Sequence, residues 1–199
     1  MQAALNRFHE NLDRARSLAG LADSLSKITT GVVDLTDILR ASLVLGVSAL
    51  DFFVHEFVRL GMIEVHRGNR PATDAHLSFK IPLLAARVAV NDTSQDNWLD
   101  QTIREAHSWL AFQHPEKIAD AVRLMSAVPL WENVSQEMGM PANGVKTQLN
   151  AIVDRRNKIA HEADMDPINP GHRWTIDSAL VNEALNFLEK LALAIYKVA

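Results

Sequence analysis

The chain has 199 residues, of which 48% are hydrophobic, and a formal net charge of −4 at pH 7. This length and composition suffice for a sizeable core, and we expect residues 1–199 to form a single domain. The acidic balance excludes a protein that coats nucleic acid through a general basic surface. The chain has no cysteine, which excludes disulfides, a thiol nucleophile and thiolate metal ligands.

The amino-terminal stretch MQAALNRFHENLDRAR carries charges throughout and contains no apolar signal core. The sequence has no uninterrupted run of about 18 apolar residues, so we expect no membrane span. The absence of cysteine fits a reducing compartment. We therefore expect a cytoplasmic protein.

Hydrophobic residues recur at intervals of three and four along most of the chain, and the strict alternation typical of strands is scarce. We therefore predict an all-α fold, a helical bundle with a long central helix and a motif helix near the C-terminal third. The first helix is expected over residues 2–26 and the second over residues 34–65. The second is apolar on most sides, so it is expected at the centre of the bundle.

The helical pattern is interrupted between residues 66 and 96, where Gly68, Pro71 and Pro82 occur. We expect an irregular excursion in this segment, with one short helix. Three helices are expected to follow, over residues 97–112, 115–126 and 130–138.

Two further helices are predicted in the C-terminal third. Pro141 is expected to begin a motif helix that ends near Glu162. A loop that contains prolines and a glycine follows it. Asp177 or Ser178 is expected to cap a last, amphipathic helix.

The most informative stretch of the sequence is DRRNKIAHE, residues 154–162. Within it, Arg156, Asn157 and His161 combine a guanidinium, an amide and an imidazole on one predicted helix. Imidazole transfers protons near neutral pH, guanidinium keeps its charge and matches phosphate geometry, and the amide can orient either group. Because this set suffices for RNA cleavage without a metal, these three are the candidate catalytic residues.

The spacing alone is a weak signal, because an arginine separated from a histidine by four to six residues arises readily by chance. Two other such pairs, Arg59 with His66 and Arg70 with His76, are interrupted by a glycine and a proline. The alternative interpretation of the motif is structural. In that case its arginine forms an ion pair within the chain and its histidine closes a helix C-terminus.

Arg156 has an unusual position for an arginine. In the predicted helix Val145, Leu149, Ile152 and Ile159 form an apolar stripe, and Arg156 falls within this stripe. An unpaired buried guanidinium is costly. We therefore expect Arg156 to contact a carboxylate, a partner subunit or a bound anion.

Because the net charge is negative, any contact with nucleic acid is expected to be local. Arg155, Arg156 and Lys158 form the densest basic cluster of the chain. Arg155 and Lys158 are therefore candidate RNA-binding residues beside the catalytic set. The alternative is a solvated helix face without a ligand.

The predicted central helix carries a thin polar stripe, formed by Ser48, Asp51 and His55, on an otherwise apolar element. Asp51 is the candidate supporting residue of the site, because its carboxylate could pair with Arg155 or Arg156. The alternative is that the stripe lies at the helix margin in solvent, or that its members satisfy one another.

Other chemistries lack their sequence patterns. The stretch from Gly139 to Lys146 has no Gly-Lys step and no preceding strand, so it does not match a phosphate-binding loop. No His-Glu pair completes H-E-x-x-H, and no histidine lies three residues after a glutamate, as dimetal bundles require. We therefore expect neither a metal nor a cofactor.

The pairing of ILRASLVLGVSALDFFVHEFVRLG with a downstream RRNKIAHEADMDP and a closing amphipathic helix resembles the HEPN superfamily, most closely its RiboL-PSP-HEPN branch of bacterial proteins. The resemblance extends from about Leu5 to Lys197. Its most specific part is the combination of SALD at residues 48–51 with RNKIAH at residues 156–161. Residues 66–140 match no family pattern, so we expect substrate selection there.

The resemblance implies a bundle that pairs with itself, so that two motifs meet in a cleft and cleave RNA without a metal. Arg156 matches the family's arginine, Asn157 its polar neighbour and His161 its histidine. Arg155 and Lys158 match no fixed motif position. By this resemblance His161 would assist attack of a ribose 2′-hydroxyl or protonate the leaving 5′-oxygen, and Arg156 would stabilise the transition state. The product would be a 2′,3′-cyclic phosphate.

The implied partners are RNA, a second copy of the chain and, in a toxin or phage-defence setting, an antitoxin or regulatory protein. An alternative from another class stays open. It is a non-catalytic helical module that binds RNA or dimerises, as an antitoxin-type partner does.

Overall fold

The computed structural model describes residues 1–30, 32–91 and 96–199. These residues form nine helices and no strand, which confirms the all-α prediction; one isolated bridge joins Met165 and Arg173. The helices are α1 (Gln2–Ser26), α2 (Thr36–His66), α3 (Asp74–Leu77), α4 (Leu83–Asn91), α5 (Asn97–His107), α6 (Pro115–Val122), α7 (Leu130–Met138), α8 (Ala142–His161) and α9 (Ser178–Val198).

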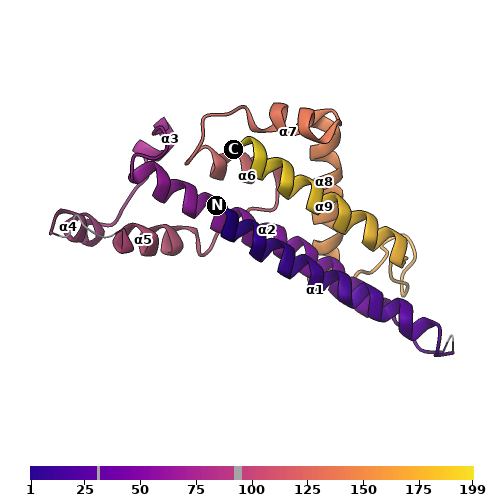
Figure 1. The fold of residues 1–199 in the computed structure, drawn as a ribbon. Helices are drawn as coiled ribbons and strands as arrows, with labels where there is room; N and C mark the ends of the chain where they lie inside the picture. The colour runs from indigo at the N-terminus through magenta and orange to yellow at the C-terminus, as the bar shows by residue number, and fades with distance from the viewer. Residues whose placement is uncertain (31, 92–95) are drawn as a thin grey trace.

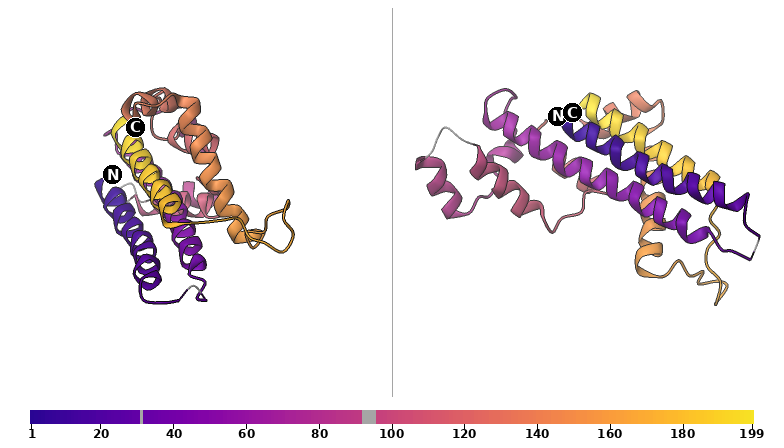
Figure 2. Two further views of the ribbon diagram at one scale, coloured as in Figure 1. Left: turned by 90° about the vertical axis from the view of Figure 1, so that its right-hand side faces the viewer. Right: turned by 60° about the horizontal axis from the view of Figure 1, so that its bottom comes forward.

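Three long helices, α1, α2 and α9, lie side by side and form the centre of the molecule (Figures 1 and 2). α1 and α2 run in opposite directions, and α9 brings the C-terminus back beside the N-terminus (Figure 1). Phe8 of α1 and two phenylalanines of α2, Phe53 and Phe57, are fully buried. The ring centroids of Phe8 and Phe53 are 5.5 Å apart, and those of Phe53 and Phe57 are 5.2 Å apart. Aromatic rings at this separation add to the free energy gained by burial.

α2 is the central helix, as its composition predicts. By length and composition it is apolar enough to cross a membrane, but 56% of the relevant stretch is buried inside the protein. It packs against α1, α9, α8 and α5. Its apolar surface is therefore largely covered by other helices of the same chain.

The predicted excursion holds two helices, not one. The four-residue α3 begins after Thr73, whose hydroxyl accepts a hydrogen bond from the backbone N–H of His76. α4 packs mainly against α5, and the two extend from the bundle as an arm (Figure 1). α4 has no buried residue. The exposed apolar side chains of this region are Leu77, Ile81, Leu83, Leu84, Val88 and Val90.

α5 and α6 end earlier than the sequence pattern predicts, at His107 and Val122 instead of residues 112 and 126. The cause at α5 is a contact with α2. The Asp51 carboxylate accepts a hydrogen bond from the backbone N–H of Phe112. This contact holds residues 108–114 in a loop against the side of α2.

α9 approaches α2 closely at Gly46. A Cβ atom at this position would overlap the side chain of Leu185 on α9. Gly20 offers a contrast, because a Cβ atom there would meet nothing within 4 Å. Glycine is therefore required by packing at one position and not at the other.

We predict that Gly46→Ala lowers the free energy of unfolding by about 1–3 kcal/mol, because the added methyl group overpacks the contact between α2 and α9. Gly20→Ala, on the exposed side of α1, is expected to raise it by up to about 1 kcal/mol through helix propensity. Urea unfolding of both variants measures the difference. Equal effects of the two substitutions would show that α2 and α9 do not approach as described.

Candidate functional site

The candidate site lies at the C-terminal end of α8, which runs at a steep angle to the three central helices (Figure 1). The apolar face of α8 is anchored in the core by four buried residues, Val145, Leu149, Ile152 and Val153. The helix ends at His161, as predicted to within a residue. The motif residues therefore occupy its last two turns.

The chain reverses directly after α8 in a tight turn. Ala163 and Asp164 have φ values of 51° and 58°, the left-handed region that residues other than glycine rarely adopt. Backbone hydrogen bonds hold the turn, because the Asp164 N–H donates to the Lys158 carbonyl and the Trp174 N–H donates to the Asp164 carbonyl, both at 2.9 Å. The turn therefore joins the helix end to the returning chain.

The side chain of Asp164 is fully buried and contacts two arginines. Its Oδ2 atom accepts hydrogen bonds from Arg40 Nε of α2 at 2.7 Å and from Arg155 Nη2 of α8 at 2.9 Å. The Trp174 carbonyl accepts from both guanidinium groups as well, at 2.9 and 3.1 Å. We call Arg40, Arg155 and Asp164 the Asp164 clamp. It fixes the end of α8 to the first turns of α2.

The contacts of Arg155 within the clamp indicate a structural role for this residue. Its side chain is only 17% exposed, and it also donates to the Thr175 carbonyl at 3.0 Å. Burial lowers the pKa of Arg155, with the positive charge of Arg40 acting in the same direction and Asp164 opposing both. The predicted RNA contact of Arg155 stays a prediction, and it would have to be made by the part of the group that the clamp leaves accessible.

Arg156 has a very different environment from its neighbour. Its Nη2 atom donates to the side-chain oxygen of Gln113, and its Nε atom, like that of Arg155, is buried without a hydrogen-bond partner. Among the residues that the structure describes, Arg156 has no carboxylate within 4.0 Å. Its charge is thus held by a neutral amide, which leaves it available to an anion.

Asn157 and His161 lie one helical turn apart on the same side of α8. Asn157 is half-buried and His161 is exposed. Neither side chain is hydrogen-bonded or ion-paired to any described part of the chain. Lys158 lies over the ring of Trp174, 5.3 Å from its centroid, a cation–π contact. Two of the three candidate catalytic side chains therefore have free polar atoms.

The predicted pairing of Asp51 with Arg155 or Arg156 is wrong. Asp51 bonds the backbone of Phe112, and its Oδ1 lies 3.9 Å from His55 Nε2. It reaches the site only indirectly, by holding the residue next to Gln113. The interpretation of this polar stripe as a helix-margin feature whose members contact one another fits better.

Sequence reasoning missed Gln113, Asp164 and Arg40. The sequence did contain a signal for Arg40, because it is a charged residue on the most apolar helix and lies between residues of the core face. The other two had none, since each acquires its role from a distant partner. No group of three or more histidine, aspartate or glutamate side chains in the described ranges is arranged to hold a metal ion.

The protein is a helical bundle in which one helix ends with the motif Arg-Asn-x-x-x-His, and this combination indicates its class. A family model confirms it: the chain matches the model described as RiboL-PSP-HEPN over residues 9–199, nearly its whole length. The protein therefore belongs to the RiboL-PSP-HEPN family. No curated protein and no solved structure matches the chain.

We predict that Asp164→Asn lowers the free energy of unfolding by about 3–5 kcal/mol, because it leaves two arginines beside a buried group without charge. Asparagine tolerates the left-handed backbone, so the substitution removes the charge and retains the turn. Asp120→Asn is the matched control. Asp120 is exposed in its ion pair with Arg123, and its loss should cost less than about 1 kcal/mol.

Urea unfolding at pH 7 measures both variants. Equal stabilities of Asp164→Asn and Asp120→Asn would contradict the role given to the clamp.

Proposed function

We propose that this protein is a metal-independent endoribonuclease with Arg156, Asn157 and His161 as its catalytic residues. Membership of the RiboL-PSP-HEPN family supports a ribonuclease. The observation that carries the proposal is the bonding of Arg156, whose guanidinium contacts an amide and not a carboxylate, five residues before an exposed histidine on the same helix. A phosphate group would supply the missing negative charge.

The proposed reaction uses only groups of the site and of RNA. A ribose 2′-hydroxyl attacks the adjacent phosphorus, its proton passes to a base, and the bond to the 5′-oxygen of the next nucleotide breaks as that oxygen takes up a proton. In this proposal His161 serves one of the two proton transfers. Arg156 stabilises the charge of the phosphorane-like transition state, and Asn157 orients the phosphate or the imidazole. The products are a 2′,3′-cyclic phosphate and a 5′-hydroxyl.

We further propose that two copies form the working enzyme. One helix end supplies one histidine, whereas the reaction needs proton transfers on both sides of the phosphorus. A second helix end across a two-fold axis would supply the other. An unrestrained ribonuclease would damage the RNA of its own cell, so we expect a toxin or phage-defence setting in which an antitoxin or regulatory protein restrains it.

A second candidate function is RNA binding without turnover. The observation that favours it is that His161 has no hydrogen bond to the described chain that would fix its tautomer and orientation, as catalytic histidines usually have. A phosphate could still bind Arg156. The two candidates differ in the effect of His161, which turnover requires and binding does not.

His161→Ala is predicted to abolish cleavage and to leave folding and RNA binding nearly unchanged, because the side chain is exposed and forms no hydrogen bond or ion pair with the described chain. His172→Ala, an exposed histidine in the loop after α8, is the matched control and should keep full activity. The assay incubates purified protein with RNA in EDTA and identifies the new end groups.

Cleavage that disappears in EDTA and returns with magnesium would contradict the mechanism. Full activity of His161→Ala would contradict the site. RNA binding by the wild type, without cleavage of any RNA tested, would favour the binding module.

The dimer is predicted to bring the two α8 ends together. Because the chain lacks cysteine, one introduced cysteine is unique in each copy. Ala160→Cys, on the exposed side of the helix end, should form a covalent dimer with a short thiol-reactive cross-linker. Leu84→Cys on the apolar arm is the control for association through α4.

Light scattering gives the mass of the untreated protein for comparison. A monomer at micromolar concentration, or cross-linking through residue 84 alone, would contradict a composite site at the α8 ends.

A further inference from the structure

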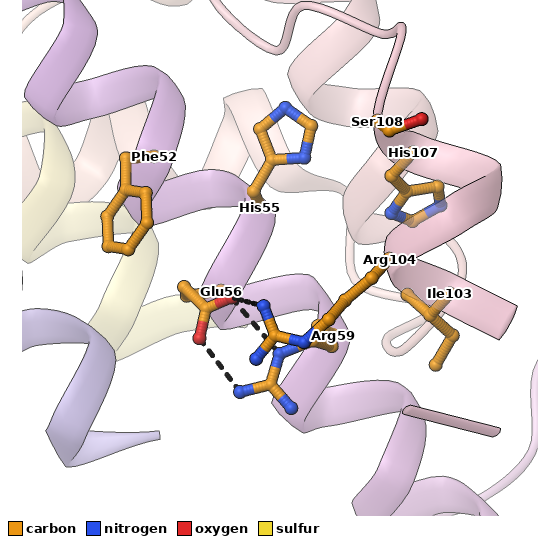
Figure 3. A pocket seen from close by; sticks show the side chains of 8 residues that line it. All are labelled: Phe52, His55, Glu56, Arg59, Ile103, Arg104, His107 and Ser108. Atoms are coloured by element: carbon orange, nitrogen blue, oxygen red, sulfur yellow. Dashed lines mark hydrogen bonds and ion pairs between the residues drawn. The ribbon is translucent and has the colours of Figure 1, made fainter. Parts of the chain in front are cut away.

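A concave surface lies between α2 and α5, on the side of α2 that faces the arm. It is a groove of about 280 Å³, lined by Phe52 and His55 of α2, by Ile103 and His107 of α5, and by Ser108, which follows α5 (Figure 3). Its surface is mainly aromatic and aliphatic, with two imidazole rings among the lining groups. We call it the α2–α5 groove.

The imidazole of His107 packs against the rings of Phe79 and Phe112, but one of its nitrogen atoms has no partner. The residue is only 5% exposed, and its Nδ1 atom is buried without a hydrogen-bond partner. Burial lowers the pKa of His107 to about 4, with a smaller contribution from His55, so the ring is neutral at pH 7. A buried polar atom without a partner destabilises a protein by about 1–3 kcal/mol. A ligand with a hydrogen-bonding edge would supply the missing partner.

The charges at the mouth of the groove cancel. Glu56 accepts hydrogen bonds from Arg59 at 2.8 Å and from Arg104 at 3.0 Å (Figure 3). Asp100 binds the same two arginines. Two guanidinium groups and two carboxylates leave no net charge, so the groove does not select an anion. It suits a neutral planar ring with donors and acceptors on its edge.

Phe52 provides a stacking surface for such a ring. Its side chain is 43% exposed although it lies on the most apolar helix, and it lines the groove from α2 (Figure 3). Aromatic side chains of this kind bind unpaired bases by stacking. The histidine rings further inside offer hydrogen bonds to the base edge.

A short loop connects the groove to the candidate catalytic arginine. The ring of Phe112 packs behind both imidazoles, with centroid distances of 4.4 Å to His55 and 5.3 Å to His107. The next residue, Gln113, bonds Arg156. Neighbouring Cα atoms are about 3.8 Å apart, so adjacent residues of one loop form the back of the groove and bind Arg156.

We propose that the α2–α5 groove binds an unpaired nucleobase of the RNA whose phosphate is bound by Arg156. The base stacks on Phe52 and hydrogen-bonds His107. This inference rests on the proposed function, since it gives that site a base-binding subsite. The same chemistry would bind a free nucleoside, and the experiment below separates the two sources.

The test measures binding of a fluorescent, non-cleavable 2′-O-methyl RNA octamer to the full chain by anisotropy. Phe52→Ala should weaken binding by about 5- to 100-fold, the effect expected for one stacked base. Leu45→Ala is the matched control, because Leu45 lies two turns away on the same face of α2 and is 40% exposed. Its affinity should equal that of the wild type.

RNA octamers with one abasic position test whether the loss of affinity in Phe52→Ala arises from a contact with a base. In the wild type, removal of the critical base should weaken binding to the same extent as Phe52→Ala. In Phe52→Ala the same abasic change should have little further effect, because the two changes remove one contact.

His107→Leu separates ligand binding from a role in the fold. Replacing an unsatisfied buried imidazole by an apolar group of similar size should leave thermal stability equal or higher. Binding of the octamer should nevertheless fall by about 5-fold or more. A loss of stability without loss of binding would show that His107 acts only in the fold.

Equal affinities of Phe52→Ala and Leu45→Ala would overturn the proposal, even if His161→Ala abolishes cleavage and the nuclease assignment stands. Adenosine or uridine that binds in a Phe52-dependent manner, but does not compete with the octamer, would also overturn it by showing a separate nucleoside site. Competition between nucleoside and octamer supports it.

Discussion

One buried carboxylate holds the C-terminal end of α8, where the candidate site lies. Asp164 is fully buried and accepts hydrogen bonds from arginines of two different helices, Arg40 at 2.7 Å and Arg155 at 2.9 Å. It also occupies a left-handed backbone position that needs such contacts to persist. Without it, two positive charges would repel each other inside the bundle. The position of α8 relative to α2, and with it the motif, depends on this contact.

The clamp distinguishes two adjacent arginines that are chemically identical. About 100° of helical rotation separates them, so one points into the clamp and the other toward the loop between α5 and α6. Arg155 shares the Asp164 carboxylate with Arg40, whereas Arg156 bonds only the amide of Gln113. A protein that needed both for stability would be expected to give both a carboxylate. This difference between the bonding partners of the two arginines is the physical basis for assigning the phosphate to Arg156.

Local signals in the sequence were enough to predict much of the fold. α1 and α7 have the predicted bounds, and at α7 the reason is Gly139, whose left-handed φ of 61° ends the helix. α5 ends early because of a tertiary contact of its loop with Asp51, which no local pattern reveals. The clamp and the partner of Arg156 could not be predicted either, because the pairs lie 124 and 43 residues apart in the chain.

The central claim is that RNA binds at the exposed end of α8, against a guanidinium without a counter-charge. The most direct measurement is the NMR spectrum of the imidazole groups of the full chain, which has eight histidines. On titration with a 2′-O-methyl RNA, the account predicts that the His161 signals shift with the same saturation curve as binding measured by anisotropy. RNA that binds while the His161 signals stay unchanged would contradict the account.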